Sequence, residues 1–195
     1  MKSTLKTLSK IATVAFVFMT FLASCSNDKT TELEEKIATL EAELQTYKDA
    51  EAITQERLVA FDSLDFEFYT NQKWENFSHS HTDDIVVYNA DGSISKGLYP
   101  NHINDLKPMF VFAPDTKIKT HPVKFGTGDW TAVIGELEGT FTEPMPIGDG
   151  KTIPPTGKTF KLRMATIGHW DGSKMSEEYL FYDNLSFMKQ IGLAE

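Results

Sequence analysis

Two histidines and a carboxylate stand close together in His79-Ser80-His81-Thr82-Asp83. Histidines separated by one residue in a loop can hold zinc, with carboxylates completing the coordination shell. The other three histidines, His102, His121 and His169, occur in scattered segments. Surface histidines are the simpler interpretation, so we predict no metal and no cofactor. If a metal were bound, His79, His81 and Asp83 would be the candidate ligands.

Cys25 is the only cysteine, and its position indicates a lipid attachment site. A basic start with Lys2, Lys6 and Lys10 leads into the apolar stretch Ile11–Ala23, which is shorter than the roughly 20 residues of a spanning helix. The run Leu-Ala-Ser-Cys resembles the lipobox of bacterial lipoproteins. This resemblance implies that residues 1–24 are a signal peptide and are removed, and that Cys25 carries the lipid. The alternative is an ordinary signal peptide with a chance cysteine.

Charge limits the possible partners. The chain has a net charge of −9, and removal of residues 1–24, with three lysines and no acidic residue, would leave −12. Nucleic-acid binding requires clustered basic residues, so we expect no nucleic-acid partner. The same charge disfavours adhesion to anionic lipid. We therefore predict that the lipid anchor alone holds the chain in the bacterial cell envelope; inner and outer membrane remain equally open.

Residues 25–50 have the pattern of a helical stalk. Thr31-Glu32-Leu33-Glu34 has the form of a capping box. The residues that follow place apolar side chains at alternating steps of four and three, which is the pattern of a coiled coil. These residues are Leu33, Ile37, Leu40, Leu44 and Tyr47. The pattern covers only about two heptads, so a single solvated helix and a dimer or trimer stem both remain open.

Residues 51–195 have the pattern of one α+β domain. Leu58, Phe61, Leu64, Asp65 and Phe68 recur at helical spacing and would face a core. Further expected elements are a short helix at 73–77, strands at 85–88, 118–125, 130–141, from 160 to about 170 and 175–182, and helices from Asn101 and near the carboxyl end. This order predicts a curved, mostly antiparallel sheet with helices packed on its concave face. Because residues 130–141 are partly apolar at both parities, we expect both faces of that strand to be covered.

Four groups of residues in the carboxyl-terminal half carry a resemblance to a known family. They are Gly139-Thr140-Phe141, Pro154-Pro155-Thr156-Gly157-Lys158, Asp171-Gly172-Ser173-Lys174, and Asp183-Asn184-Leu185 with Gln190-Ile191-Gly192-Leu193. Together they resemble the SnoaL-like polyketide cyclase (ester cyclase) family of the nuclear-transport-factor-2-like superfamily, over about residues 55–193. The resemblance implies a cone-shaped fold with a deep, mostly apolar pocket.

The same resemblance implies where an acid or base would stand. The family's catalytic aspartate falls on Leu180, which cannot transfer a proton, and its supporting histidine falls on Ala165 or Thr166. Asp183 matches a later carboxylate of the family and could be catalytic, although helix capping is the simpler role. Glu178 shares a strand face with Leu180 and Tyr182. A glutamate between apolar walls can have a raised pKa and act as a base.

Three functions follow as hypotheses. The first is a membrane-anchored module that binds a small, largely apolar molecule, with a pocket formed by Tyr88, His102, Trp130, Thr166, Leu180 and Tyr182. The second is an enzyme of the cyclase, isomerase or hydrolase type that uses Glu178 or Asp183. The third is an oligomeric envelope assembly protein. We adopt the first, since the expected catalytic aspartate is absent.

Overall fold

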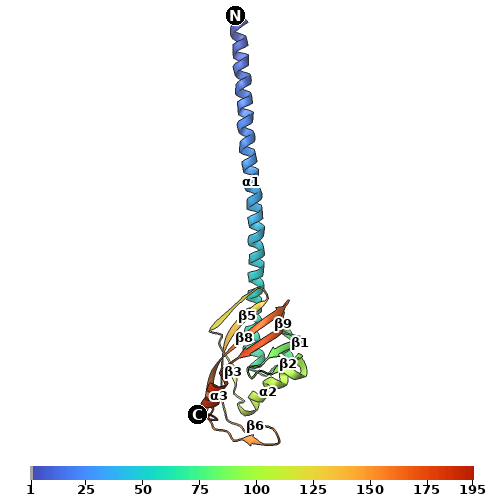
Figure 1. The fold of residues 1–195 in the computed structure, drawn as a ribbon, viewed down its shortest axis with the longest axis vertical. Coiled ribbons are helices and arrows are strands. Elements are labelled where there is room, and N and C mark those ends of the chain that lie inside the picture. Colours follow the sequence, from blue (N-terminus) through green and yellow to red (C-terminus); the bar gives the residue numbers. More distant parts are fainter. Residues whose placement is uncertain (1) are drawn as a thin grey trace. The chain divides into compact units, whose positions relative to one another are not determined.

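The computed structural model describes the backbone of residues 2–195 and the side chains of residues 28–195. The chain divides into two compact units, residues 1–49 and residues 50–195. Helix α1 (Lys2–Ser63) includes the described part of the first unit and the first residues of the second (Figure 1). The predicted lipid attachment at Cys25 concerns a side chain outside the described residues.

In the first unit, the apolar positions of the predicted stalk are all exposed. Leu33, Ile37, Leu40, Leu44 and Tyr47 lie on α1, each with more than half of its surface accessible. Among the described residues, no helix is both long and apolar enough to cross a membrane. The described part of this unit is thus one helix with an apolar stripe.

The second unit contains the elements that form the site. In chain order after α1 they are η1 (Leu64–Tyr69), η2 (Trp74–His79), β1 (His81–Tyr88), β2 (Ile94–Lys96), η3 (Leu98–His102), α2 (Ile103–Phe112), β3 (Lys117–Ile118), β4 (Val123–Thr127), β5 (Trp130–Thr140), β6 (Met145–Pro146), β7 (Thr152–Ile153), β8 (Thr159–Asp171), β9 (Lys174–Phe181) and α3 (Asn184–Gln190). The segments η1, η2 and η3 are short π- or 3-10-helical turns.

Seven of the strands form one sheet in the order β2-β1-β9-β8-β5-β3, with β4 also paired to β5. Only β1 and β9 are parallel to each other; the other pairs are antiparallel. The predicted α+β fold with a curved, mostly antiparallel sheet is confirmed. The long ladder between β5 and β8 joins Trp130 to His169 at one end and Thr140 to Thr159 at the other.

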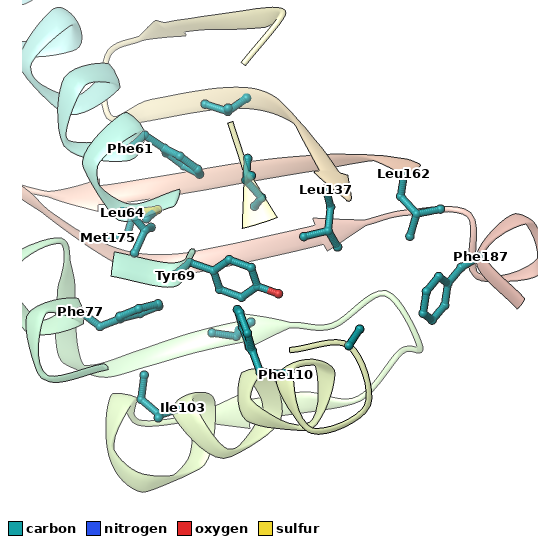
Figure 2. Packing of buried hydrophobic residues seen from close by; sticks show 14 of the residues in the cluster. Phe61, Leu64, Tyr69, Phe77, Ile103, Phe110, Leu137, Leu162, Met175 and Phe187 are labelled. Carbon is teal, nitrogen blue, oxygen red and sulfur yellow. The ribbon is translucent and has the colours of Figure 1, made fainter. Parts of the chain in front are cut away.

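The core lies between the sheet and the helical segments (Figure 2). Phe61 and Leu64 come from the end of α1 and the start of η1, Phe110 comes from α2, and Leu137 and Leu162 point inward from β5 and β8. A fully buried side chain of this size stabilises a fold by about 1.5–3 kcal/mol. The packing of these residues therefore fixes the helices against one face of the sheet.

A buried arginine connects α1 to two hairpin turns. The Arg57 guanidinium donates hydrogen bonds to the carbonyls of Gly128 and Gly172, and it forms an ion pair with Asp129 at 3.0 Å. The turns are those between β4 and β5 and between β8 and β9. Since Arg57 is only 6% exposed, these bonds offset the free-energy cost of removing its charge from water.

Two local predictions were wrong in ways that matter for the site. The first strand begins at His81 rather than at residue 85, so His81 occupies an inward strand position instead of a loop. The strand predicted at 118–125 is two strands, β3 and β4, with His121 and Pro122 between them. Proline cannot donate to a ladder, which explains the break.

Candidate functional site

A cavity of about 320 Å³ lies between α2 and the inner face of the sheet. Its walls are largely apolar, with Leu106 and Met109 from α2 facing Leu137, Leu162 and Leu180 from three neighbouring strands. Polar residues of the β1–β2 turn and the first turn of α2 complete the lining, namely Asn89, Asp91, Ser93, Asn104 and Asp105. An apolar interior with polar groups at one side suits a small, mostly apolar molecule.

A second, smaller cavity of about 60 Å³ adjoins the first. Four residues line both cavities and therefore lie at the boundary between them, namely Tyr69, Leu106, Met164 and Leu180. The smaller cavity differs from the larger one in the kind of polar residue that lines it. Its lining includes four buried ionisable side chains, those of Asp65, His81, His102 and Glu178.

Three of these polar side chains meet around one carboxylate oxygen. The Nε2 atom of His102 lies 3.4 Å from Oε2 of Glu178, and the Nε2 atom of His81 lies 3.9 Å from the same oxygen. His81 begins β1, His102 ends η3, and Glu178 is in β9. All three side chains are at most 7% exposed. The fold thus brings together residues that are far apart in sequence.

The protonation of this group follows from burial and charge. Burial disfavours the Glu178 carboxylate, but His81 and His102 outweigh that effect and hold the pKa of Glu178 below its usual range. Burial lowers the pKa of His102 more than the nearby Glu178 charge raises it. Near neutral pH the site therefore holds an ionised carboxylate beside a neutral imidazole. Such a pair can accept a proton from a bound molecule or fix its polar end.

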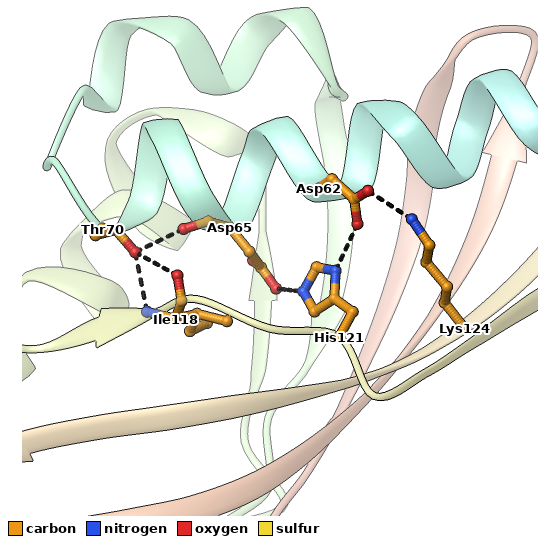
Figure 3. Close-up of polar contacts among 6 residues, drawn as sticks. All are labelled: Asp62, Asp65, Thr70, Ile118, His121 and Lys124. Atoms are coloured by element: carbon orange, nitrogen blue, oxygen red, sulfur yellow. Dashed lines mark hydrogen bonds and ion pairs between the residues drawn. The ribbon is translucent and has the colours of Figure 1, made fainter.

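A second polar cluster lies next to this site (Figure 3). The His121 ring donates from Nδ1 to Asp62 and from Nε2 to Asp65, both at 2.8 Å, and Lys124 also contacts Asp62. Thr70 accepts a hydrogen bond from the Ile118 amide and donates one to the Asp65 carbonyl. These bonds attach the end of α1 and η1 to the segment between β3 and β4.

Charges in this second cluster stabilise one another. Although burial opposes the charged imidazole, the hydrogen bonds and charges of Asp65 and Asp62 raise the pKa of His121. Burial likewise opposes the Asp62 carboxylate, but Lys124 and His121 lower the pKa of Asp62. The two carboxyl groups thus favour the charged form of His121, which positions Asp65 in the wall of the smaller cavity.

Most of the predicted pocket residues line these cavities. His102, Thr166 and Glu178 line the smaller cavity, Tyr182 lines the larger one, and Leu180 lines both. The alternation of β9 explains the grouping, because Glu178, Leu180 and Tyr182 share a parity. Leu180 is an apolar wall residue here.

Tyr88 and Trp130, by contrast, are not in either cavity. Tyr88 stacks on Tyr179 at 4.4 Å between ring centroids, and Trp130 stacks on His169 at 4.3 Å. The inward positions of β5 start at Thr131, and those of the second half of β1 are Ile85 and Val87, so both aromatic residues lie on the outer face. Trp130 is 42% exposed, whereas Ala132 and Ile134 on the same face are half-buried, so the expected cover over this face of β5 is partial.

The remaining predicted site residues lie apart from the cavities. Asp183 caps α3, accepting a hydrogen bond from the Ser186 amide at 2.9 Å, which is the simpler of its two predicted roles. His79 and Asp83 are exposed, whereas His81 is buried. The trio of metal candidates is therefore divided, and only His81 joins the polar site.

Sequence reasoning did not single out Asp62, Asp65 or His121 as site residues. One signal was available, because Asp65 interrupts an apolar helical stripe, and a carboxylate at a buried position requires a partner. The partner itself, His121, was noted only as one of three histidines in scattered segments. Its pairing with two aspartates more than fifty residues away depends on the tertiary fold.

Comparison with known proteins agrees with this geometry. The family model described as SnoaL-like polyketide cyclase matches residues 63–191, which include both cavities' strands and α2. No curated protein sequence matches the chain significantly. The family match covers most of the second unit and none of the predicted leader.

Solved structures share the fold at low sequence identity. A candidate SnoaL-like polyketide cyclase from Jannaschia sp. CCS1 has a TM-score of 0.62 at 17% identity, over 73% of this chain and 96% of that one. IdmH, a candidate polyketide cyclase from Streptomyces antibioticus, has a TM-score of 0.57 at 20% identity, over 70% and 98%. A Catenulispora acidiphila protein with a ketosteroid isomerase-like fold, solved with trimethylamine, has a TM-score of 0.56 at 16% identity, over 72% and 95%.

Proposed function

The chain belongs to the SnoaL-like polyketide cyclase family, and we propose on that premise that its domain binds a small, largely apolar molecule. The observation that carries the proposal is the cavity of about 320 Å³, apolar over most of its wall and adjoining the buried polar site at Glu178. Ligand pockets of roughly 300–1,000 Å³ with few, well-placed polar groups are typical of small-molecule sites.

We also propose that the domain works at a membrane surface of the bacterial cell envelope. The support is the sequence around Cys25, where the Leu-Ala-Ser-Cys run follows a basic and then apolar amino end. A lipid there would keep the domain close to apolar molecules that partition into membranes. The two parts of the proposal are independent and are tested separately.

Binding in the larger cavity can be tested with two substitutions on neighbouring residues of β9. Leu180→Trp would place a larger side chain in the space beside the wall shared by both cavities. Phe181→Trp introduces the same side chain at an outward residue that is 54% exposed. With a neutral, apolar fluorescent probe such as N-phenyl-1-naphthylamine, we expect saturable binding by the unchanged chain. Leu180→Trp should weaken it by at least about tenfold, equivalent to 1.4 kcal/mol.

The matched variant decides the interpretation. Phe181→Trp should leave the probe's dissociation constant unchanged within twofold. Equal binding by the Leu180→Trp and unchanged chains, with both folded by circular dichroism, would contradict binding in this cavity. Native mass spectrometry of the unchanged chain would in addition identify any molecule that it retains.

A second candidate function is proton transfer to or from the bound molecule. The observation that favours it is the buried Glu178 carboxylate beside an apolar wall. Because His81 and His102 lower the pKa of Glu178, the raised pKa expected from the sequence is wrong, but the lowered pKa keeps this carboxylate ionised and able to accept a proton. Glu178→Gln keeps the shape but removes the basic oxygen. If this function is correct, the unchanged chain in deuterium oxide should introduce deuterium into its retained ligand. Glu178→Gln should abolish that exchange; exchange at an equal rate would exclude Glu178.

A further inference from the structure

The hydrogen bonds of His81 define which of its ring nitrogens faces the polar site. Its Nδ1 atom lies 3.1 Å from the Phe77 carbonyl oxygen and 3.0 Å from the Ser80 hydroxyl. A carbonyl oxygen can only accept, so Nδ1 carries the hydrogen. Nε2 is then the ring nitrogen of His81 that faces Glu178, at 3.9 Å from its Oε2 atom.

Three buried polar atoms of the site lack hydrogen-bond partners. Nε2 of His81, Nδ1 of His102 and Oε2 of Glu178 are buried, and none of them has a hydrogen-bond partner among the described residues. A buried carboxylate without compensation costs several kcal/mol. A proton on Nε2 of His81 would face the Glu178 oxygen, but at 3.9 Å the two atoms are too far apart for a hydrogen bond. A cation bound by one ligand atom of each residue would contact His81, His102 and Glu178 together.

The distances agree with a shared ion. One ligand atom from each of His81, His102 and Glu178 can be chosen so that all lie within 4.8 Å of one another. Two ligands about 2.1 Å from one tetrahedral ion lie about 3.4 Å apart. The contact of His102 with Glu178 is already 3.4 Å, and that of His81 with Glu178 is 3.9 Å. Binding one ion would require His81 to move inward toward the other two ligands.

We propose that His81, His102 and Glu178 bind one divalent transition-metal cation of the zinc type. Two imidazoles and one carboxylate suit zinc and its first-row neighbours, whereas calcium and magnesium prefer oxygen ligands. The Phe77 carbonyl orients His81 in the way that outer-shell partners orient metal-binding histidines. Three protein ligands leave a coordination position open, and the smaller cavity lies beside it.

The inference rests on the proposed function in one respect, namely that the ion would meet the polar end of the molecule in the apolar cavity. It also competes with the second candidate function. A Glu178 oxygen that binds a cation is not free to act as a base, so the two make different predictions for metal-loaded protein.

The test is a titration of the full chain in mild detergent with Co²⁺, whose visible absorption reports its ligands, followed by competition with Zn²⁺. Cys25→Ser would be present throughout, since a free thiol also binds these ions. We expect one Co²⁺ per chain. His102→Gln or Glu178→Gln should weaken binding by more than about 100-fold, the upper range for loss of an outer-shell partner. His79→Gln, at an exposed histidine two residues before His81, should bind as the parent does.

Two results would overturn the inference. One is a folded parent chain that takes up no stoichiometric Co²⁺ or Zn²⁺. The other is uptake that His102→Gln and Glu178→Gln leave unchanged. If both variants fail to fold, zinc-loaded crystals of the parent chain can be measured at the zinc absorption edge to locate the ion. The inference requires an ion between His81, His102 and Glu178, and its absence there would overturn the inference.

Failure of this inference is distinguishable from failure of the proposed function. Binding of the apolar probe, measured with a chelator present, depends on Leu180 and the cavity walls alone. A chain that binds the probe but no metal retains the proposed function without the ion. A chain that binds metal but no probe retains the ion without the apolar ligand.

Discussion

His121 lies between two carboxylates, and both of its ring nitrogens are used. The Nδ1 atom contacts Asp62 and the Nε2 atom contacts Asp65, and these two carboxyl groups raise the pKa of His121 and so favour its imidazolium form, which donates from both nitrogens. Burial also raises the pKa of Asp65. The Phe66 ring, with its centroid 4.4 Å from that of His121, covers one side of it. The protonation of His121 therefore makes the free energy of unfolding depend on pH. The residue lies close to the smaller cavity but outside its polar site.

The raised pKa of His121 determines the direction in which the free energy of unfolding changes with pH. Since the folded-state pKa exceeds the unfolded value of about 6.5, the stabilisation is complete below that pH. It is lost as the pH rises through the folded-state pKa. We expect the free energy of unfolding to fall across this window by up to about 1.4 kcal/mol per pH unit more than in His121→Gln.

Urea unfolding from pH 6 to pH 9 measures this difference. At pH 6, His121→Gln should also be less stable by about 3 kcal/mol, because it leaves Asp65 buried without its charged partner. His79→Gln is the matched control, since that histidine is exposed and has no pair of carboxylates. Parallel pH profiles for the unchanged chain and His121→Gln would show that the charge on His121 contributes nothing to stability.

At the scale of elements, alternation predicted the inward side of β9 and the apolar stripe at the end of α1. Glu178, Leu180 and Tyr182 share a parity in the sequence, and all three line the cavities. Parity is a local property, so a period of two residues is enough to find it. The α+β order and the capping role of Asp183 are local in the same sense.

The errors at the element scale have a different physical origin. Parity alone does not say which face of a strand is buried, and Trp130 was placed inward although Thr131 and Val133 hold that face of β5. The length of β1 was underestimated because His81, Thr82 and Asp83 are polar. Their strand conformation is imposed by pairing with β9, where His81 lies opposite Met175.

The long-range polar contacts could not be predicted from the sequence for a further reason. From its place in a helical sequence, Arg57 would be expected to be exposed to solvent. It is instead buried and donates hydrogen bonds to the Gly128 and Gly172 carbonyls of two distant turns. The pairing of His102 with Glu178 likewise joins a helical turn to a strand 76 positions later. Such contacts are fixed by the packing of the apolar core, and the polar partners follow from it.

The two units of the molecule contribute different properties, and the exposed stripe on α1 belongs to the first. Leu33, Ile37, Leu40 and Leu44 would be covered by a second or third copy of the same helix, but two heptads give little stability in free solution. Chains held in one membrane meet at a much higher effective concentration. Pairing of the stalk is therefore proposed as a property of the anchored protein.

That proposal depends on a lipid at Cys25, which gives the last prediction. In cells fed an alkynyl fatty acid, the unchanged chain should become labelled, and its first residue by mass spectrometry should be a lipid-modified Cys25. Cys25→Ser removes the only thiol, so it should carry no label and should not begin at position 25. Ser26→Ala, a neighbouring change that keeps the thiol, should be labelled normally. Label on Cys25→Ser, which would place the acyl chain at another residue, or an unchanged chain that starts upstream of Cys25, would refute a lipid anchor at Cys25.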